Sequence, residues 1–154
     1  MKVELIVIGK TDKDFVKEGI QVFKKKIGHY LPFTIKELPA GNHSNREKAL
    51  KEEGLRILKL IQPRDELILL DHGGKTYSSE NFAKFMEKKM SNVNGTLYFA
   101  IGGPFGFSKD VYDRAKGKLS LSPMIFSHQI IRLIFLEQLY RSMTIIRNEP
   151  YHHS

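Results

Sequence analysis

The sequence predicts an α/β fold in which helices cover both faces of a mainly parallel sheet. Short apolar runs rich in β-branched residues alternate with longer segments of helical periodicity along the 154 residues. This alternation is typical of parallel sheets joined by crossover helices. Two of the runs end in glycine-rich stretches, as strands do where they lead into ligand-binding loops. A chain of this length forms one domain with a sizeable core, so we expect residues 1–154 to be a single domain.

Five strands are predicted. Three of them are almost wholly apolar, namely Lys2–Ile8, Glu66–Leu70 and Thr96–Ile101, and this suits strands that are covered on both faces. Phe33–Leu38 lies between two prolines and is therefore expected at an edge of the sheet. Leu119–Ser122 is the fifth predicted strand.

A predicted helix follows each strand. Ser44 and Glu47 have the spacing of a capping box, and Ser78 and Ser108 are typical N-cap residues. The predicted helices are Asp12–Tyr30, Ser44 to Ile61, a helix that begins after Ser78, a short helix between Ser108 and Gly117, and a long helix from Ser127 to Arg147.

The composition favours a polyanionic partner, above all a nucleic acid. Lysine and arginine number 25 against 17 acidic residues, which gives a net charge of +8 and a pI near 9.6, and basic surfaces suit nucleic acids. The sequence contains no cysteine, which excludes disulfides, thiolate catalysis and Cys-ligated metals. The six histidines match no metal-binding pattern, so we expect no metal site.

The sequence carries no signal for a membrane or for export. No apolar run reaches the roughly 20 residues that cross a bilayer, and the first residues lack the pattern of a signal peptide. We therefore expect a cytoplasmic protein without membrane contact.

A run of three lysines, Lys24, Lys25 and Lys26, lies near the end of the first predicted helix. Such a run suits either contact with phosphate or the solvated end of a helix, where cations are favourable. The solvated helix end is the favoured interpretation, because charge runs are most often plain surface.

Three loops are expected at one edge of the sheet. Ligands of parallel sheets bind beyond the carboxyl ends of the strands, and Leu70–Lys75, Gly102–Ser108 and Leu121–Phe126 follow three of the predicted strands. Glycines in the first two loops would let a ligand lie against the main chain. Neither G-x-x-x-x-G-K-[ST] nor G-x-G-x-x-G is present. An adenosine without phosphates is therefore a better candidate than a nucleotide phosphate.

The last predicted helix is apolar over most of its surface. Its polar residues form one narrow stripe of Glu137, Arg141, Thr144 and Asn148, in which Glu137 and Arg141 have the spacing of an ion pair. A helix this apolar needs cover on several sides. The core of the domain covers one side, and a second subunit is the natural cover for another, so a homodimer is expected.

Several polar residues near the end of the chain could take part in chemistry. A buried Arg132 must find a carboxylate, a helix end or a ligand, so it is either a ligand contact or half of an intersubunit salt bridge. His128 fits a capping or core role better than catalysis. Tyr151, His152 and His153 offer a stacking ring and titratable imidazoles, but a terminal pair of histidines is more typical of a frayed end, or of residues left from cloning, than of catalysis.

Six motifs together resemble a known family. They are Leu70-Asp71-x-x-Gly74-Lys75, Ile101-Gly102-Gly103-Pro104-x-Gly106, Leu119-Ser120-Leu121-Ser122, His128-Gln129-x-x-Arg132, Glu137-Gln138-x-Tyr140-Arg141 and Pro150-Tyr151-His152. On these motifs the whole chain resembles the ribosomal RNA large subunit methyltransferase H family, the bacterial 23S ribosomal RNA pseudouridine N3-methyltransferases of the SPOUT class. Ser127 and Ser142 stand where that family usually has proline and alanine, and neither change affects the implied activity.

This resemblance implies a parallel α/β sheet with a C-terminal trefoil knot, a homodimer, and S-adenosylmethionine as the cofactor. It also implies large-subunit ribosomal RNA, within assembled ribosomes, as the partner. The cofactor contacts that it implies are Leu70, Gly102, Leu121, Ser122, Pro123, Met124, Ile125 and Phe126. The glycines would then let main-chain groups bond the adenine and the ribose.

The implied reaction moves a methyl group directly to N3 of a pseudouridine. That nitrogen carries a proton at neutral pH, so a base is needed. We expect His152 to be the base, Arg132 or Arg141 to stabilise the negative charge on the ring, and Tyr151 to stack on a base. Two alternatives are a knotted methyltransferase that acts on tRNA and a basic RNA-binding protein without catalytic activity.

Overall fold

The computed structural model describes residues 1–42 and 44–153, and in this range the chain forms one five-stranded sheet with five helices. All neighbouring strands are parallel, in the order β2-β1-β4-β3-β5, so the predicted fold class is confirmed. The strands are β1 (Lys2–Ile8), β2 (Phe33–Leu38), β3 (Glu66–Thr76), β4 (Thr96–Ile101) and β5 (Gly117–Ser120). The helices are α1 (Asp14–Gly28), α2 (Arg46–Leu60), α3 (Ser79–Asn92), α4 (Lys109–Arg114) and α5 (Ile130–Ile146).

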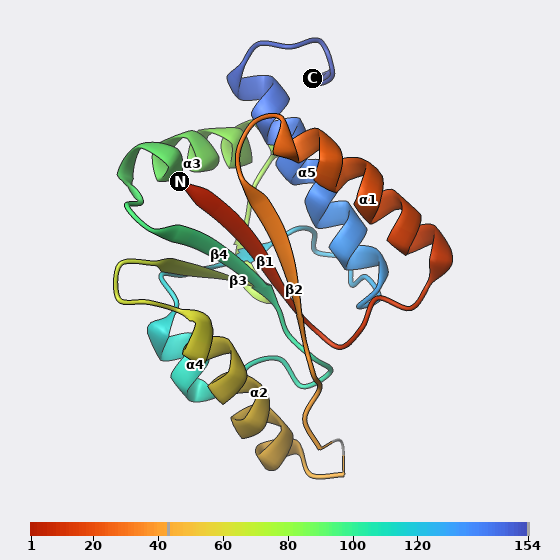
Figure 1. The fold of residues 1–154 in the computed structure, drawn as a ribbon, viewed down its shortest axis with the longest axis vertical. Helices are drawn as coiled ribbons and strands as arrows, with labels where there is room; N and C mark the ends of the chain where they lie inside the picture. Colours follow the sequence, from red (N-terminus) through yellow and green to blue (C-terminus); the bar gives the residue numbers. More distant parts are fainter. Residues whose placement is uncertain (43, 154) are drawn as a thin grey trace.

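Helices cover both faces of the sheet. Figure 1 shows α1, α3 and α5 on one face and α2 and α4 on the other. Because side chains alternate along a strand, β1 contributes to two cores. Val3, Leu5 and Val7 pack with the core of the first face, whereas Ile6 and Ile8 pack with that of the second. All five side chains are buried, which explains why β1 is apolar at nearly every position.

The helix α5 supplies the centre of the larger core. Phe135 is fully buried, and its ring centroid lies 4.8 Å from that of Phe99 on β4 and 6.4 Å from that of Phe82 on α3. Tilted and edge-on ring pairs at these separations are favourable. Phe135 therefore joins the last helix to the middle of the sheet.

We expect Phe135→Ala to lower the free energy of unfolding by about 3–5 kcal/mol, because lost burial and the cavity left behind add together. Urea unfolding followed by circular dichroism measures this change. Leu55→Ala on α2 is the control, since Leu55 is 61% exposed, and we expect its effect to stay below about 0.5 kcal/mol. Equal effects of the two substitutions would contradict the central role of Phe135.

Two strand boundaries differ from the prediction. β3 continues past its predicted end at Leu70 as far as Thr76, and β5 is Gly117–Ser120 rather than Leu119–Ser122. The pairing of these two strands is irregular between the two halves of β3. Gly74 lets them approach, because a Cβ there would lie 2.6 Å from a main-chain nitrogen of β5. Much of the segment predicted as a loop is therefore paired strand.

The predicted helix caps are confirmed at two of three positions. The hydroxyls of Ser78 and Ser108 each accept a hydrogen bond from the main chain three residues further on. In α2, however, the N-cap is Asn45 rather than Ser44, and its side chain accepts from the Lys48 amide at 3.1 Å. Asparagine and serine cap helices about equally well, so the sequence did not distinguish these neighbours.

Candidate active site

A cavity of about 340 Å³ opens at the carboxyl ends of β4 and β5, beside the middle of β3. Three segments line it, namely residues 70–72 of β3, the glycine-rich loop after β4, and the loop between β5 and α5. The parallel topology brings these segments together from distant parts of the chain, as the sequence predicts. Ligand pockets in proteins commonly have at least this volume and a mainly apolar lining.

Most of the predicted cofactor contacts lie together here. Pro123 is exposed and is not part of the lining, whereas Met124 and Ile125 belong to the lining and are 74% and 83% exposed. The loop therefore presents two apolar side chains to solvent at the cavity. The seven predicted residues that line it are Leu70, Gly102, Leu121, Ser122, Met124, Ile125 and Phe126.

The glycine-rich loop is folded so tightly that its main chain forms a wall of the cavity. Gly106 donates its N–H to the Gly103 carbonyl at 3.1 Å, and its φ of +80° favours glycine. A Cβ at Gly102 would lie 2.8 Å from the carbonyl oxygen of Gly106. That separation is closer than real Cβ atoms approach, so any side chain at Gly102 would push the loop open.

Ser122 shapes the loop between β5 and α5. Its carbonyl accepts a hydrogen bond from the Ser120 hydroxyl at 2.9 Å, and its own hydroxyl accepts from the Met124 amide at 3.0 Å. Further on, the Ser127 hydroxyl accepts from the amide of Ile130 at 3.2 Å. These local bonds turn the chain around the cavity and into the first turn of α5.

Arg132 joins the first turn of α5 to the end of β1. Its Nη2 donates to the Ile8 carbonyl at 2.9 Å, and its Nη1 donates to the Thr11 hydroxyl at 2.8 Å. The side chain is 2% exposed, its Nε is buried without a partner, and burial lowers the pKa of the guanidinium. Neutral oxygens of its own chain therefore hold Arg132, and it is not part of the cavity lining.

The tail after α5 is held in place, and the expectation of a frayed end is wrong. The Tyr151 hydroxyl donates to Glu137 at 2.8 Å, and Arg141 donates to the same carboxylate at 2.9 Å. The predicted pairing of Glu137 with Arg141 is therefore confirmed. The guanidinium also lies 4.8 Å from the centroid of the Tyr151 ring. Burial, followed by the bond to Glu137, raises the pKa of the Tyr151 hydroxyl.

The His152 ring is contacted at both of its nitrogens. Nδ1 lies 3.0 Å from Nη1 of Arg141, and Nε2 lies 2.8 Å from Oε1 of Glu80 on α3. A guanidinium can only donate, so Nδ1 accepts and the proton on Nε2 faces Glu80. The hydrogen bond from His152 lowers the pKa of the Glu80 carboxyl. In this arrangement neither nitrogen of His152 has a free lone pair.

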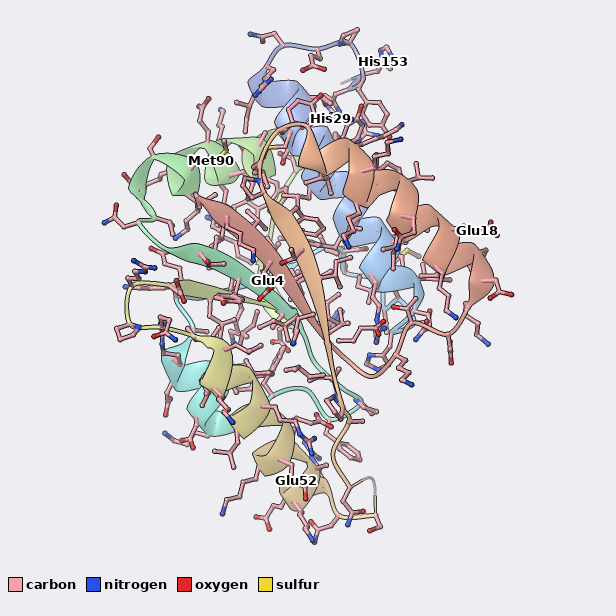
Figure 2. The ribbon with its side chains drawn as sticks, in the orientation of Figure 1. Glu4, Glu18, His29, Glu52, Met90 and His153 are labelled. Carbon is pink, nitrogen blue, oxygen red and sulfur yellow. The ribbon has the colours of Figure 1, made fainter. Side chains whose placement is uncertain are left out.

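The tail and the cavity lie at opposite ends of α5. His128 and Ile131 line the cavity at its start, whereas Arg141 and His152 meet at its end. A helix of 17 residues is about 25 Å long. Figure 2 shows His153, next to His152 in the sequence, beyond the far end of α5. One chain alone therefore does not bring the predicted base and the predicted cofactor contacts together.

Sequence reasoning missed several residues that line the cavity or contact the tail. Glu80 is 72 positions from His152, and no local pattern connects them. Asp71 and His72 also line the cavity; they belong to the predicted ligand-binding segment Leu70–Lys75, of which only Leu70 was named as a cofactor contact. Their place directly after the apolar run of β3 was the available signal.

Among residues 1–42 and 44–153, no group of three or more His, Asp or Glu side chains is placed to hold a metal ion. Over the same residues, none of the helices combines the length and the apolar character needed to cross a bilayer.

The class of protein follows from a match to a known family. A family model described as "Predicted SPOUT methyltransferase" matches residues 1–152. The chain therefore belongs to the SPOUT methyltransferase family.

Within this class, the chain is similar over its full length to proteins named Ribosomal RNA large subunit methyltransferase H. The protein of that name from Parabacteroides distasonis is 51% identical over 156 residues, which cover 99% of both chains. The one from Cytophaga hutchinsonii is 48% identical over 155 residues, or 99% of this chain and 100% of the relative. The one from Flavobacterium johnsoniae is 47% identical over 157 residues, or 99% of both. The family resemblance found in the six motifs is confirmed.

Proposed function

We propose that this chain transfers a methyl group from S-adenosylmethionine to N3 of a pseudouridine in 23S ribosomal RNA of the large subunit. The observation that carries the proposal is the cavity walled by bare main chain at Gly102, in a chain of the SPOUT methyltransferase family. The names of its relatives favour ribosomal RNA over tRNA as the substrate. They also favour a catalyst over a protein that only binds RNA.

The residues around the cavity fit this cofactor. Side chains such as Leu70, Leu121 and Phe126 form an apolar surface for an adenine ring, and the absence of a side chain at Gly102 leaves main-chain groups free to bond a nucleoside. When bound, the cofactor supplies an electrophilic methyl group on sulfur. In the proposed enzyme these loops bind and orient the adenosine and keep water from the reacting atoms.

A homodimer is part of the proposal. Phe15 and Val22 on α1 and Ile130 on α5 are 60%, 52% and 39% exposed, and they flank the contact of Gly19 with Leu133 that joins the two helices. An exposed apolar face of this kind suits a second copy of the chain. Two-fold pairing with the α5 helices in opposite directions would bring the partner's tail to this chain's cavity. Each site would then receive its base from the other subunit.

Family membership supports two further parts of the proposal. The resemblance to the SPOUT class implies a trefoil knot in the C-terminal segment, and we propose this threading for the present chain, which belongs to that family. We also propose that the enzyme acts in the cytoplasm on assembled ribosomes, since its relatives are named for large-subunit ribosomal RNA.

The tail residues handle the RNA base in the proposed reaction. Arg141 stabilises the negative charge that develops on the ring as N3 loses its proton, and Tyr151 stacks on a base. His152 accepts the proton, which requires that RNA binding separates its Nδ1 from Arg141, now 3.0 Å away. Arg132 is bound to the end of β1 instead, so Arg141 is the better candidate of the two arginines.

His152→Ala is expected to lower the single-turnover methylation rate by roughly 100-fold or more, the contribution of a typical general base, with unchanged affinity for S-adenosylmethionine. The rate is measured on ribosomes by quenching and mass spectrometry. His153→Ala is the matched control, because His153 is exposed, and it should react at the wild-type rate. Full activity of the His152→Ala protein would remove His152 from the mechanism.

Mass spectrometry of ribosomal RNA from cells with and without this gene tests the proposal as a whole. We expect the loss of one methyl group from one pseudouridine of the large-subunit RNA. The purified protein should bind S-adenosylmethionine in calorimetry and should methylate ribosomes but not tRNA. Methylation of tRNA would favour a knotted methyltransferase that acts on tRNA. Failure to bind the cofactor would favour a basic RNA-binding protein without catalytic activity.

A further inference from the structure

A second groove, of about 630 Å³, lies between α1 and the edge strand β2. Three lysines line the groove, namely Lys10, Lys17 and Lys24. Lys10 follows the end of β1. Lys17 and Lys24 are two turns apart on one face of α1, which places their Cα atoms roughly 10 Å apart. The groove therefore carries a row of ammonium groups.

The three consecutive lysines Lys24, Lys25 and Lys26 do not share the same surroundings in the structure. Lys24 lines the groove, whereas Lys26 lies 5.7 Å and 5.2 Å from the ring centroids of Phe23 and Tyr140. The favoured interpretation as a solvated helix end is confirmed for Lys25 and Lys26, which are exposed in the last turn of α1, but it does not describe Lys24. Lys24 instead belongs to a set of lysines that the fold assembles from separate parts of the sequence.

The charge of the groove is not neutralised by the chain itself. None of the three lysines forms a salt bridge within the described part of the chain. Glu37 is the acidic residue in the lining, and its Oε2 already accepts the Thr11 amide at 2.9 Å. Three lysines and one carboxylate leave the lining with a net positive charge, so the groove favours an anionic partner.

We propose that this groove, lined by Lys10, Lys17 and Lys24, binds the phosphate backbone of the ribosomal RNA at a distance from the target nucleotide. This inference rests on the proposed function. A row of separated ammonium groups fits an extended polyanion, because each lysine meets a phosphate as a point charge. The groove begins at Lys10, beside the carboxyl end of β1. A strand of RNA in it therefore leads toward the sheet edge where the cavity opens.

The groove remains accessible in the proposed dimer. Lys17 and Lys24 lie on one side of α1, next to β2, whereas Phe15 and Val22 lie on the side next to α5. Their helical spacing places the two pairs on different faces of α1. A second copy that covers the apolar face therefore leaves the lysines free for RNA.

Reversal of two charges tests the groove. We expect the double variant Lys17→Glu/Lys24→Glu to bind large-subunit ribosomal RNA roughly tenfold more weakly at about 0.1 M salt. The slope of log affinity against log salt should become shallower by about 1.4–1.8, since each lost phosphate contact removes 0.7–0.9. Filter binding over a salt series measures both quantities. Affinity for S-adenosylmethionine, measured by calorimetry, should not change.

The matched control is Lys84→Glu/Lys88→Glu, which makes the same change in net charge at two exposed lysines of α3. Its RNA affinity and salt slope should stay close to those of the wild type. An equal loss in both double variants, or no loss in the groove variant, would overturn the proposal. A changed dimer mass with intact RNA binding would make the groove a protein interface, which also overturns it. If the proposed function itself is wrong, the wild-type protein already fails to bind the cofactor or to methylate ribosomes.

Discussion

Gly102→Val is expected to weaken binding of S-adenosylmethionine by roughly 100-fold or more, because a close backbone approach leaves no room for a side chain. A Cβ at this position would lie 2.8 Å from the carbonyl oxygen of Gly106 and 3.1 Å from its carbon. Both obstacles are main chain, so no rotamer change relieves them. The glycine-rich loop must open, and the wall of the cavity is lost. Calorimetric titration with the cofactor measures the loss.

Gly28→Val provides the matched control. Gly28 is the last residue of α1, and a Cβ there would meet no atom within 4 Å. The same substitution should therefore leave cofactor binding at the wild-type level. Thermal unfolding of both variants shows whether the domain remains folded. A folded Gly102→Val protein that binds the cofactor as tightly as the Gly28→Val protein would contradict the role of this loop.

Mixed dimers of Gly102→Val and His152→Ala chains are expected to recover methylation that neither variant shows alone. The base and the cavity lie at opposite ends of α5, which is about 25 Å long, and the proposed dimer combines the base of one subunit with the cavity of the other. In a mixed dimer, one site then carries both defects and the other carries none. One of its two sites is therefore intact, so the isolated mixed dimer should reach about half of the wild-type activity.

Co-expression of the two variants with different affinity tags, followed by purification on both tags, isolates the mixed dimer. Its activity on ribosomes is compared with that of each parent. A site completed within one chain predicts no recovery, because every site of the mixed dimer would then carry one of the two defects. That result would rule out the exchange of tails between subunits, while leaving methylation by the wild-type protein unaffected.

The sequence predicts the fold well where the pattern of apolar residues reflects which side chains are buried. Runs such as Lys2–Ile8 are apolar at nearly every position because both faces of β1 are covered, and that pattern is visible without coordinates. The continuation of β3 to Thr76 was missed because its second half contains polar residues and two glycines. Those residues are typical of turns. The pairing with β5, a contact with a distant part of the chain, overrides that local signal.

The candidate site could likewise be predicted only in part from the sequence. Parallel topology alone brings the second half of β3 and the loops that contain Gly102 and Leu121 to one cavity. The surroundings of His152 could not be derived, because they depend on Glu80 from another helix. The partners of Arg132 could not be derived either, since a buried guanidinium can donate its hydrogen bonds in many arrangements. Here it donates to two oxygens near the end of β1.

Gly19 of α1 packs against the side chain of Leu133 on α5. A Cβ on Gly19 would lie 2.7 Å from Cδ1 of Leu133, so the two helices approach closely at this position, and the ring centroids of Phe23 on α1 and Tyr140 on α5 lie 5.9 Å apart. This packing joins the helix that carries Lys17 and Lys24 to the helix that begins beside the cavity. If RNA binds as we propose, the distance between the groove and the cavity determines which nucleotide reaches the cavity when a phosphate is bound in the groove.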